Sequence, residues 1–476
     1  MLIREAEIGG VVQDLRIAGV NIESIAPRLE RRGDEAVIEA GGGALLPGLR
    51  DHHLHLASLA AARASLHCGP PTVRDAQQFA ALLRQQAGGE DWLRGIGYHE
   101  SVAGDIDRHW LDRHLPGRPL RIQHRGGRLW VLNTRALQAL GLRDAGDDPF
   151  ERIDGRLTGR LYDDDAWLRR RLGLRRPDLA EASRHLASRG VTAVTDTSPG
   201  NTPAELDWLA QAQRRGELMQ DVLAMGDASL DGIREQAAQD PQQPSLHIGA
   251  HKFHLHDAHL PEFDTVLAAV RRSHAAGRGA AFHCVTRAEL VFALGVLAED
   301  GPHAGDRIEH AAVAPPELLQ EIRSQGLTVV TQPGFVAERG DAYLEQVEAE
   351  DRPWLYRLRG FLDAGVPLAG STDAPFGEAE PWRAMQAAVD RRSAGRRVLQ
   401  GGEGLSPEQA LALFSAPLCS PGGMPAPLAA GARADLCLLP QSWAVARRDL
   451  AAVQPRLTVR GGQPLWAEQG VFVRAE

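Results

Sequence analysis

Eight short apolar segments alternate with longer amphipathic segments along most of the chain, and this rhythm limits the possible folds more than any other feature. The apolar segments have the length of strands, and the segments between them show the spacing of helices. Such alternation is typical of a parallel sheet with helical crossovers, and eight strands make a closed (β/α)8 barrel. The predicted strands are residues 44–49, 190–196, 221–225, 246–255, 279–283, 307–310, 327–332 and 366–373.

Both ends of the chain depart from this rhythm. Residues 1–46 consist of short β-like pieces separated by glycines and charged turns, and the tail returns to short strands after Gly431. We therefore predict an α/β protein with a TIM barrel of residues 47–414. Residues 1–46 and 415–476 together are predicted to build a small β-sandwich domain.

A large insertion of about residues 56–180 follows the first barrel strand. It has helical pieces and six tryptophan and tyrosine side chains, in a chain with 5% aromatic residues. Such side chains line pocket walls, and they also form the cores of inserted subdomains. The sequence leaves open whether this cap-like region covers a site or is a satellite core.

Composition excludes several classes of partner. A net charge of -9 argues against nucleic acid and against anionic membranes. No apolar run approaches the ~20 residues that span a bilayer, and the N-terminal residues lack the apolar stretch of a signal peptide. Four widely spaced cysteines form no CxxC pair and are expected to be reduced. We expect a cytoplasmic protein with a small-molecule substrate, and a homodimer is the default expectation for its assembly.

Two histidines alternate just after the break at Pro47 and Gly48. In an extended segment His53 and His55 point to the same face, where two imidazoles make half of a site for a divalent metal. Alone this motif is weak, because surface histidines also pair by chance. Further polar residues follow at the ends of the later predicted strands, namely Lys252, His283, His310 and Asp373. Barrel active sites lie at the carboxyl ends of the strands, so this ordered set predicts a single site.

Lys252 is the only lysine in the chain, and every other residue counted as Lys or Arg is arginine. An amine can lose its proton and react, whereas a guanidinium cannot do so under ordinary conditions. A leftover surface lysine would carry no information. The position of Lys252 at a strand end instead favours a chemical role.

These motifs resemble the amidohydrolase superfamily, and specifically amidohydrolase family 3, which includes N-substituted formamide deformylases. The resemblance covers nearly the whole chain. It rests on residues 47–55, 123–133, 190–196, 307–310, 370–375 and 431–436.

The resemblance implies a centre of two divalent metal ions. The implied ligands are His53, His55 and Asp373 for the more buried ion, and His283 and His310 for the more exposed one. Lys252, carboxylated by carbon dioxide, would bridge the ions. Zinc is the first expectation, although manganese, cobalt or iron suit the same ligands. Asp373 would be the catalytic base, taking a proton from the metal-activated water and passing it to the leaving nitrogen.

The implied function is metal-dependent hydrolysis of a non-peptide C–N bond in an N-formyl or N-acyl amine-like substrate. Hydrolysis of a cyclic amide, or deamination, is the alternative within the superfamily. A metal-dependent lyase or decarboxylase and an inactive ligand-binding relative also remain open. The bridging lysine favours two metals over the one that is typical of deaminases, and a binder without activity would not need the base.

Four residues are candidates for substrate binding. His124, Arg125 and Arg128 in the insertion could grip a substrate carboxylate, but a structural ion pair explains them equally well. His254 alternates with Lys252 and could face the site, but it could also be an exposed loop residue.

Overall fold

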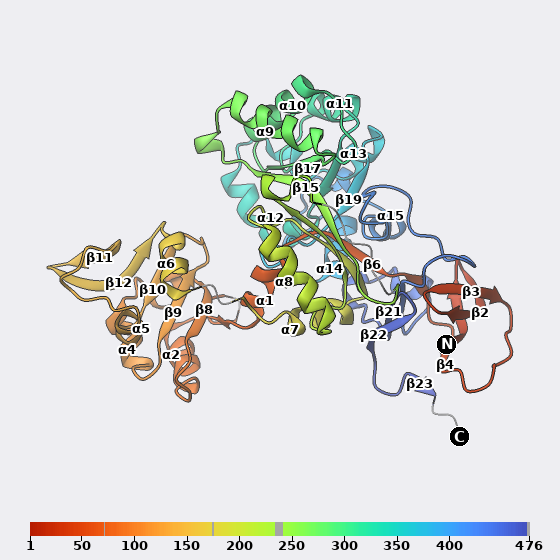
Figure 1. The fold of residues 1–476 in the computed structure, drawn as a ribbon, viewed down its shortest axis with the longest axis horizontal. Coiled ribbons are helices and arrows are strands. Elements are labelled where there is room, and N and C mark those ends of the chain that lie inside the picture. The colour runs from red at the N-terminus through yellow and green to blue at the C-terminus, as the bar shows by residue number, and fades with distance from the viewer. Residues whose placement is uncertain (71, 174–175, 234–240, 474–476) are drawn as a thin grey trace. The chain divides into compact units, whose positions relative to one another are not determined.

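The computed structural model describes residues 1–70, 72–173, 176–233 and 241–473. The chain separates into two compact units, one of Met1–Leu56 with Leu179–Glu476 and one of Ala57–Asp178 (Figure 1). The first unit contains the barrel and two small sheets, and the second contains a sheet of its own. The division of the chain into sandwich, barrel and cap at the residues given above remains a prediction.

Eight parallel strands confirm the predicted (β/α)8 class. In chain order they are β6 (Leu49–Leu54), β13 (Val191–Asp196), β14 (Asp221–Gly226), β15 (Leu246–His254), β16 (Ala280–Cys284), β17 (Arg307–His310), β18 (Thr328–Thr331) and β19 (Leu368–Gly370). Each strand pairs with the next in this order. The Asp373 N–H donates to the His53 carbonyl at 2.8 Å, and the His55 N–H donates to the Ala374 carbonyl at 2.9 Å. These bonds bring the last strand end to the first, where the site residues lie.

Helices cover the outside of the barrel. They include α7 (Ala180–Ser188), α8 (Pro203–Arg214), α9 (Phe263–Ala275), α10 (Arg287–Asp300), α11 (Pro316–Ser324), α12 (Gly334–Gln346), α13 (Arg359–Asp363), α14 (Pro381–Asp390) and α15 (Pro407–Ala412). Figure 1 shows α9, α10 and α11 next to one another. Capping fixes where α10 begins, because Thr286 and Glu289 form a capping box. Among the described residues no helix is long and apolar enough to cross a membrane.

The first barrel strand lies later in the chain than predicted. The predicted strand at residues 44–49 is instead β5 (Leu45–Pro47), which pairs antiparallel with a strand near the C-terminus. The barrel strand β6 begins only after Gly48. A Cβ at Gly48 would lie 2.4 Å from the Thr192 side chain, so only glycine lets the two strands approach there.

Both ends of the chain build a small β-sandwich, as predicted. One sheet contains β1 (Leu2–Ile8), β2 (Val11–Ala18), β3 (Asn21–Ala26), β4 (Val37–Glu39) and β23 (Phe472–Val473). The other contains β5, β20 (Leu436–Leu438), β21 (Leu457–Arg460) and β22 (Gln463–Ala467). Alternate apolar residues such as Ile3, Leu15, Leu436 and Leu457 meet in one shared core.

The insertion contains a six-stranded sheet that the sequence analysis did not foresee. Its strands are β7 (Leu66–His67), β8 (Leu93–Tyr98), β9 (Leu120–His124), β10 (Leu129–Leu132), β11 (Phe150–Ile153) and β12 (Arg156–Tyr162). Helices α1 (Leu56–Arg63), α2 (Ala76–Gln85), α3 (Glu100–Ala103), α4 (Arg108–His114), α5 (Thr134–Ala139) and α6 (Asp165–Leu172) complete the region. Five of the six tryptophan and tyrosine residues belong to or pack against its own two apolar clusters. These side chains therefore form a satellite core, and a capping role remains a prediction.

Removing a large side chain from this core should destabilise the insertion without altering the barrel. Phe79 is fully buried and stacks on Trp110, with ring centroids 4.9 Å apart. Phe79→Ala should cost about 3–5 kcal/mol of unfolding free energy in the insertion. Calorimetry of Phe79→Ala should show the unfolding transition of the insertion at a lower temperature and the transition of the barrel unit unchanged. Phe282→Ala, at a buried position in β16, should have the reverse effect; a common shift for both variants would refute independent units.

Candidate metal centre

The predicted ligands lie at the carboxyl ends of the barrel strands. His53 lies in β6, Lys252 in β15, His283 in β16 and His310 in β17. His55 directly follows β6, and Asp373 comes three residues after the end of β19. The potential ligand atoms of His53, His55 and Asp373 lie within 4.8 Å of one another. Asp373 Oδ1 is 3.3 Å from the Nε2 atoms of both histidines. These three residues have the separation of ligands around one metal ion.

The other two histidines lie beside this group. The rings of His283 and His310 are 4.4 Å apart between centroids, and the rings of His310 and His53 are 4.9 Å apart. Burial, together with the charge of His53, lowers the pKa of His310 to about 3. Burial also lowers the pKa of His283. Both imidazoles are therefore neutral, which is the form that binds a metal.

Lys252 is buried among these ligands with an amine that has no hydrogen-bond partner in the described part of the chain. Its side chain approaches Glu309 and Asp373 closely enough for their charges to act on it. Nevertheless, burial is the dominant effect and lowers the pKa of Lys252 to about 8. A buried amine without a partner is costly, and a lowered pKa increases the neutral fraction that can react with carbon dioxide. The residue fits the predicted carboxylation.

A carboxylate outside the ligand set orients His53. The His53 Nδ1–H donates to Glu309 Oε2 at 2.5 Å, and Arg307 holds the same carboxylate. Although burial opposes ionisation, the charges of Arg307, Lys252 and His53 hold the pKa of Glu309 well below its usual range. The other ring nitrogen, Nε2, faces the Asp373 carboxylate. A proton or a metal ion must lie between Nε2 and this carboxylate, because both carry lone pairs. A carboxylate behind a histidine ligand is a common arrangement at metal sites.

Two other side chains have the same relation to His310 and His55. The His310 Nδ1–H donates to Gln332 Oε1 at 2.7 Å, and the Gln332 amide in turn donates to Ser371 at 3.0 Å. His55 Nδ1 lies 3.2 Å from Ser198 Oγ. Each contact leaves the Nε2 atom of the histidine directed away from its partner and available as a ligand.

Hydrogen bonds hold Asp373 in an unfavourable backbone conformation. Its φ is 54°, in the left-handed region that only glycine adopts freely. Buried Asp51 accepts from the neighbouring Thr372, at 2.5 Å from the hydroxyl and 3.1 Å from the N–H. Burial raises the pKa of Asp51 to about 6 even though these bonds oppose the change. A strained residue that its surroundings hold in place is typical of a functional site.

Sequence reasoning missed Asp51, Glu309 and Gln332. For two of them a signal was present. Asp51 precedes His53 by two residues and therefore points to the same face of β6, and Glu309 directly precedes His310. Gln332 ends a predicted strand, but no neighbouring residue indicates its role, because it acts on His310 of a different strand.

Replacing Glu309 with glutamine should weaken metal binding by about 10–100-fold, because the charged acceptor behind His53 is lost. Competition with a chromophoric chelator would measure this affinity. The matched control is Glu403→Gln, which changes another buried carboxylate that accepts from Arg357 and from the Leu358 and Gly360 N–H groups. That variant should lose stability and keep its metal affinity. Equal affinities in both variants would show that Glu309 has no positioning role.

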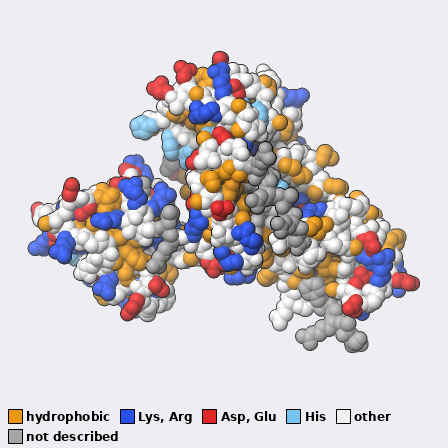
Figure 2. Space-filling view, in the orientation of Figure 1, with side chains coloured by type: hydrophobic (Ala, Val, Ile, Leu, Met, Phe, Trp, Pro, Cys, Tyr) orange, Lys and Arg blue, Asp and Glu red, His pale blue; other side chains and the backbone are white. Residues whose placement is uncertain are grey.

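The predicted substrate residues belong to both compact units: His254 is in the unit that contains the barrel, and the other three are in the insertion. His254 is exposed and stacks between His256 and His283, with centroid separations of 4.5 and 4.3 Å. Figure 2 shows pale blue histidine side chains over the segment that joins β15 to α9. In the insertion, Arg128 pairs with Asp163 at 2.5 Å, as the structural alternative predicted. There His124 Nε2 bonds Glu100 at 2.9 Å and Arg125 is exposed, so substrate contacts by these residues remain predictions.

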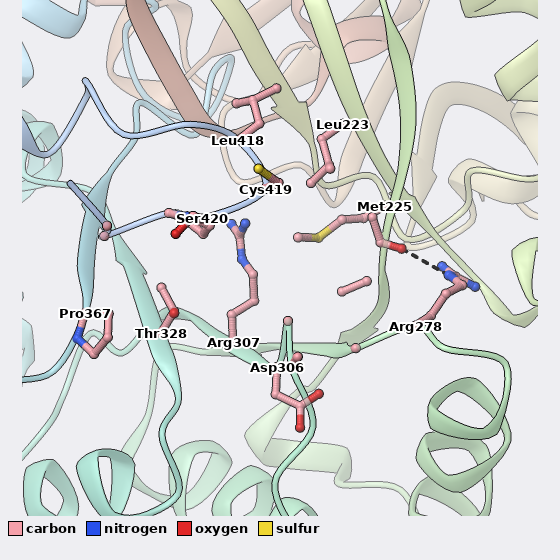
Figure 3. A pocket seen from close by; sticks show the side chains of 18 of the residues that line it. Leu223, Met225, Arg278, Asp306, Arg307, Thr328, Pro367, Leu418, Cys419 and Ser420 are labelled. Atoms are coloured by element: carbon pink, nitrogen blue, oxygen red, sulfur yellow. Dashed lines mark hydrogen bonds between the residues drawn. The ribbon is translucent and has the colours of Figure 1, made fainter. Parts of the chain in front are cut away.

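A cavity of about 480 Å³ lies at the opposite end of the barrel (Figure 3). Its walls include Arg307 and Thr328 at the starts of β17 and β18, and the loop that contains Cys419 and Ser420. Since barrel enzymes place their chemistry at the carboxyl ends of the strands, this cavity is not the candidate active site.

Comparison with known proteins agrees with the geometry. The profile of the amidohydrolase family matches residues 36–466. N-substituted formamide deformylase of Arthrobacter pascens is 24% identical over 489 aligned positions, which cover 90% of each chain. The fold is similar to those of two uncharacterized metal-dependent hydrolases. That of Pyrococcus horikoshii OT3 has a TM-score of 0.76 at 19% identity and covers 97% of this chain and 99% of its own.

The hydrolase of Pyrococcus furiosus has a TM-score of 0.71 at 21% identity and covers 93% of this chain and 99% of its own. The similarity to these two structures shows the fold alone. The match to the family profile covers most of the chain and therefore shows the family. The protein therefore belongs to the amidohydrolase family and is a metal-dependent hydrolase acting on carbon–nitrogen bonds other than peptide bonds.

Proposed function

We propose that this enzyme hydrolyses the amide bond of an N-formyl or N-acyl amine at a centre of two divalent ions, most readily zinc. The observation that carries the proposal is the buried Lys252 amine, which has no hydrogen-bond partner among the described residues. It lies near Asp373 of the first ligand group and near His283 and His310 of the second. A carbamate on this amine supplies two oxygen ligands between the groups. A centre for one metal would not need it.

The chain supplies the following roles in this proposal. His53, His55 and Asp373 would hold one ion, His283 and His310 would hold the other, and carboxylated Lys252 would supply an oxygen to each. When bound, the ions lower the pKa of a shared water and polarise the substrate carbonyl. Asp373 accepts the proton of the attacking water on its free oxygen and donates it to the amine that leaves. His53 and His55 hold the pKa of Asp373 well below its usual range against the opposing effect of burial, so the carboxylate is ionised.

The rim of the site suits an apolar substituent on the substrate nitrogen. Phe376 follows Asp373 by three residues and is 58% exposed, although it is large and apolar. Its ring meets His55 edge to face, with centroids 5.4 Å apart. An aromatic side chain left in solvent beside the ligands offers a surface for an alkyl or aryl amine. The name of the Arthrobacter relative points to the same substrate class.

Metal analysis combined with a substrate panel tests the proposal. Protein purified without chelator and with bicarbonate should contain close to two ions per chain at this centre, apart from any ion bound elsewhere. It should cleave N-formyl or N-acetyl derivatives of benzylamine faster than cyclic amides or amino-substituted heterocycles. One ion per chain with deaminase activity would refute the proposal. Two ions with activity only on cyclic amides would preserve the centre and refute the substrate class.

A further inference from the structure

A second group of metal-ligating side chains lies at the outer, amino-terminal side of the barrel sheet. His274 is on the last turn of α9, His303 is in the connection between α10 and β17, and Asp306 directly precedes β17. One potential ligand atom of each residue lies within 4.8 Å of the others. Asp306 and Arg307 point in opposite directions from their strand (Figure 3). The Arg307 side chain reaches Glu309 inside the barrel, and Asp306 reaches His274 on the helix outside it.

The hydrogen bonds of His274 are those of a metal ligand with a carboxylate behind it. Its Nδ1–H donates to Asp300 Oδ2 at 2.5 Å, which fixes the ring. Its Nε2 faces Asp306 Oδ1 at 2.9 Å. The same relation of carboxylate, histidine and facing carboxylate occurs at His53 in the candidate active site, and it is typical of zinc sites.

Two buried atoms in the group have no hydrogen-bond partner among the described residues. They are His303 Nδ1 and Asp306 Oδ2. Asp306 is only 4% exposed, and its other oxygen accepts from the Ala280 N–H at 2.7 Å as well as facing His274. A protonated His274 between Asp300 and Asp306 would satisfy the ion pairs. It would leave both buried atoms unsatisfied, whereas a cation bound between His303 and Asp306 would satisfy both.

We propose that His274 Nε2, His303 Nδ1 and the Asp306 carboxylate bind a zinc ion that is separate from the active centre. Nitrogen and carboxylate donors in this number suit zinc, with water as the fourth ligand. The two rings are nearly parallel, 10° apart with centroids separated by 4.3 Å, so they must splay to reach one ion. His303 can tilt because Gly301 and Gly305 border its loop, each with φ of 92°. The ion links the end of α9 to the start of β17 and would stabilise the barrel.

Zinc stoichiometry tests this site. Wild-type protein, stripped of metal and dialysed against zinc with bicarbonate, should contain one more ion per chain than His303→Ala prepared in the same way. Asp306→Asn keeps an oxygen for the Ala280 N–H and should lose the same single ion. His67→Ala, at an exposed histidine of the insertion, should match wild type. Equal zinc in wild type and both site variants would overturn the proposal.

Cobalt provides a second readout that does not depend on activity. The spectrum of cobalt-loaded wild type minus that of cobalt-loaded His303→Ala should contain the visible bands of one four-coordinate ion. Zinc should also raise the melting temperature of metal-free wild type more than that of the variant. A flat difference spectrum with equal melting shifts would show that His274 only forms ion pairs with Asp300 and Asp306.

Discussion

Replacing Asp373 with asparagine should lower kcat by at least about 10³-fold while both metal ions remain bound. Asparagine has almost the same shape and keeps an oxygen that can serve as a ligand. It cannot accept the proton of the attacking water or return one to the leaving nitrogen. Steady-state kinetics on the best substrate of the panel, with metal analysis of the same preparation, would measure both effects.

Asp51→Asn is the matched control for this loss. Asp51 is likewise buried and lies in β6, but its carboxylate accepts from Thr372 and from the His53 N–H and is not one of the proposed metal ligands. The control should lose some stability and no more than about 10-fold in kcat, because it supports the backbone of Asp373 without moving a proton. If Asp373→Asn kept wild-type turnover, the assignment of the base would be wrong.

Replacing Lys252 with arginine should remove at least one metal ion and lower kcat/KM by a factor of about 10³ or more. The guanidinium keeps a positive charge but cannot form a carbamate, so the bridge is lost. Loss of one metal removes several kcal/mol of transition-state stabilisation. A fully metallated and active variant would refute carboxylation of this residue.

Lys252→Ala distinguishes loss of the bridge from loss of the fold. This variant leaves a space beside the ligands that a short carboxylic acid can enter. Added acetate or propionate should restore part of the metal content and of the activity, because its carboxylate has the same donor atoms as the carbamate. A folded variant that no acid rescues would indicate that the amine itself, and not its carbamate, is required.

The grouping of the candidate ligands could be predicted because local rules place these residues. Each follows a short apolar run, and parallel strands in a barrel bring their carboxyl ends to one face. His53 and His55 need only the alternation of an extended segment to point the same way. The first strand was placed too early for an equally local reason. Leu45 and Leu46 are as apolar as a barrel strand, and their partner near Cys437 is almost four hundred residues away.

The insertion could be predicted less well. Its strands are two to seven residues long and carry arginines such as Arg94, Arg121 and Arg160, and the alternation of apolar and polar residues is limited to short stretches such as Leu120–His124. Cation–π contacts accommodate the arginines in these strands, since Arg94 and Arg121 both lie over the Trp130 ring. The sheet is therefore stable for reasons that appear only when distant strands meet.

The sequence by itself determined the barrel class, the order of the candidate ligands and the place of the single lysine among them, because strand period and side-chain chemistry are properties of short segments. Tertiary structure alone decided which groups orient those ligands. Glu309 reaches His53 across 256 positions, and Asp306 reaches His274 across 32. Such contacts depend on which strands and helices become neighbours, and nothing in either short segment specifies them.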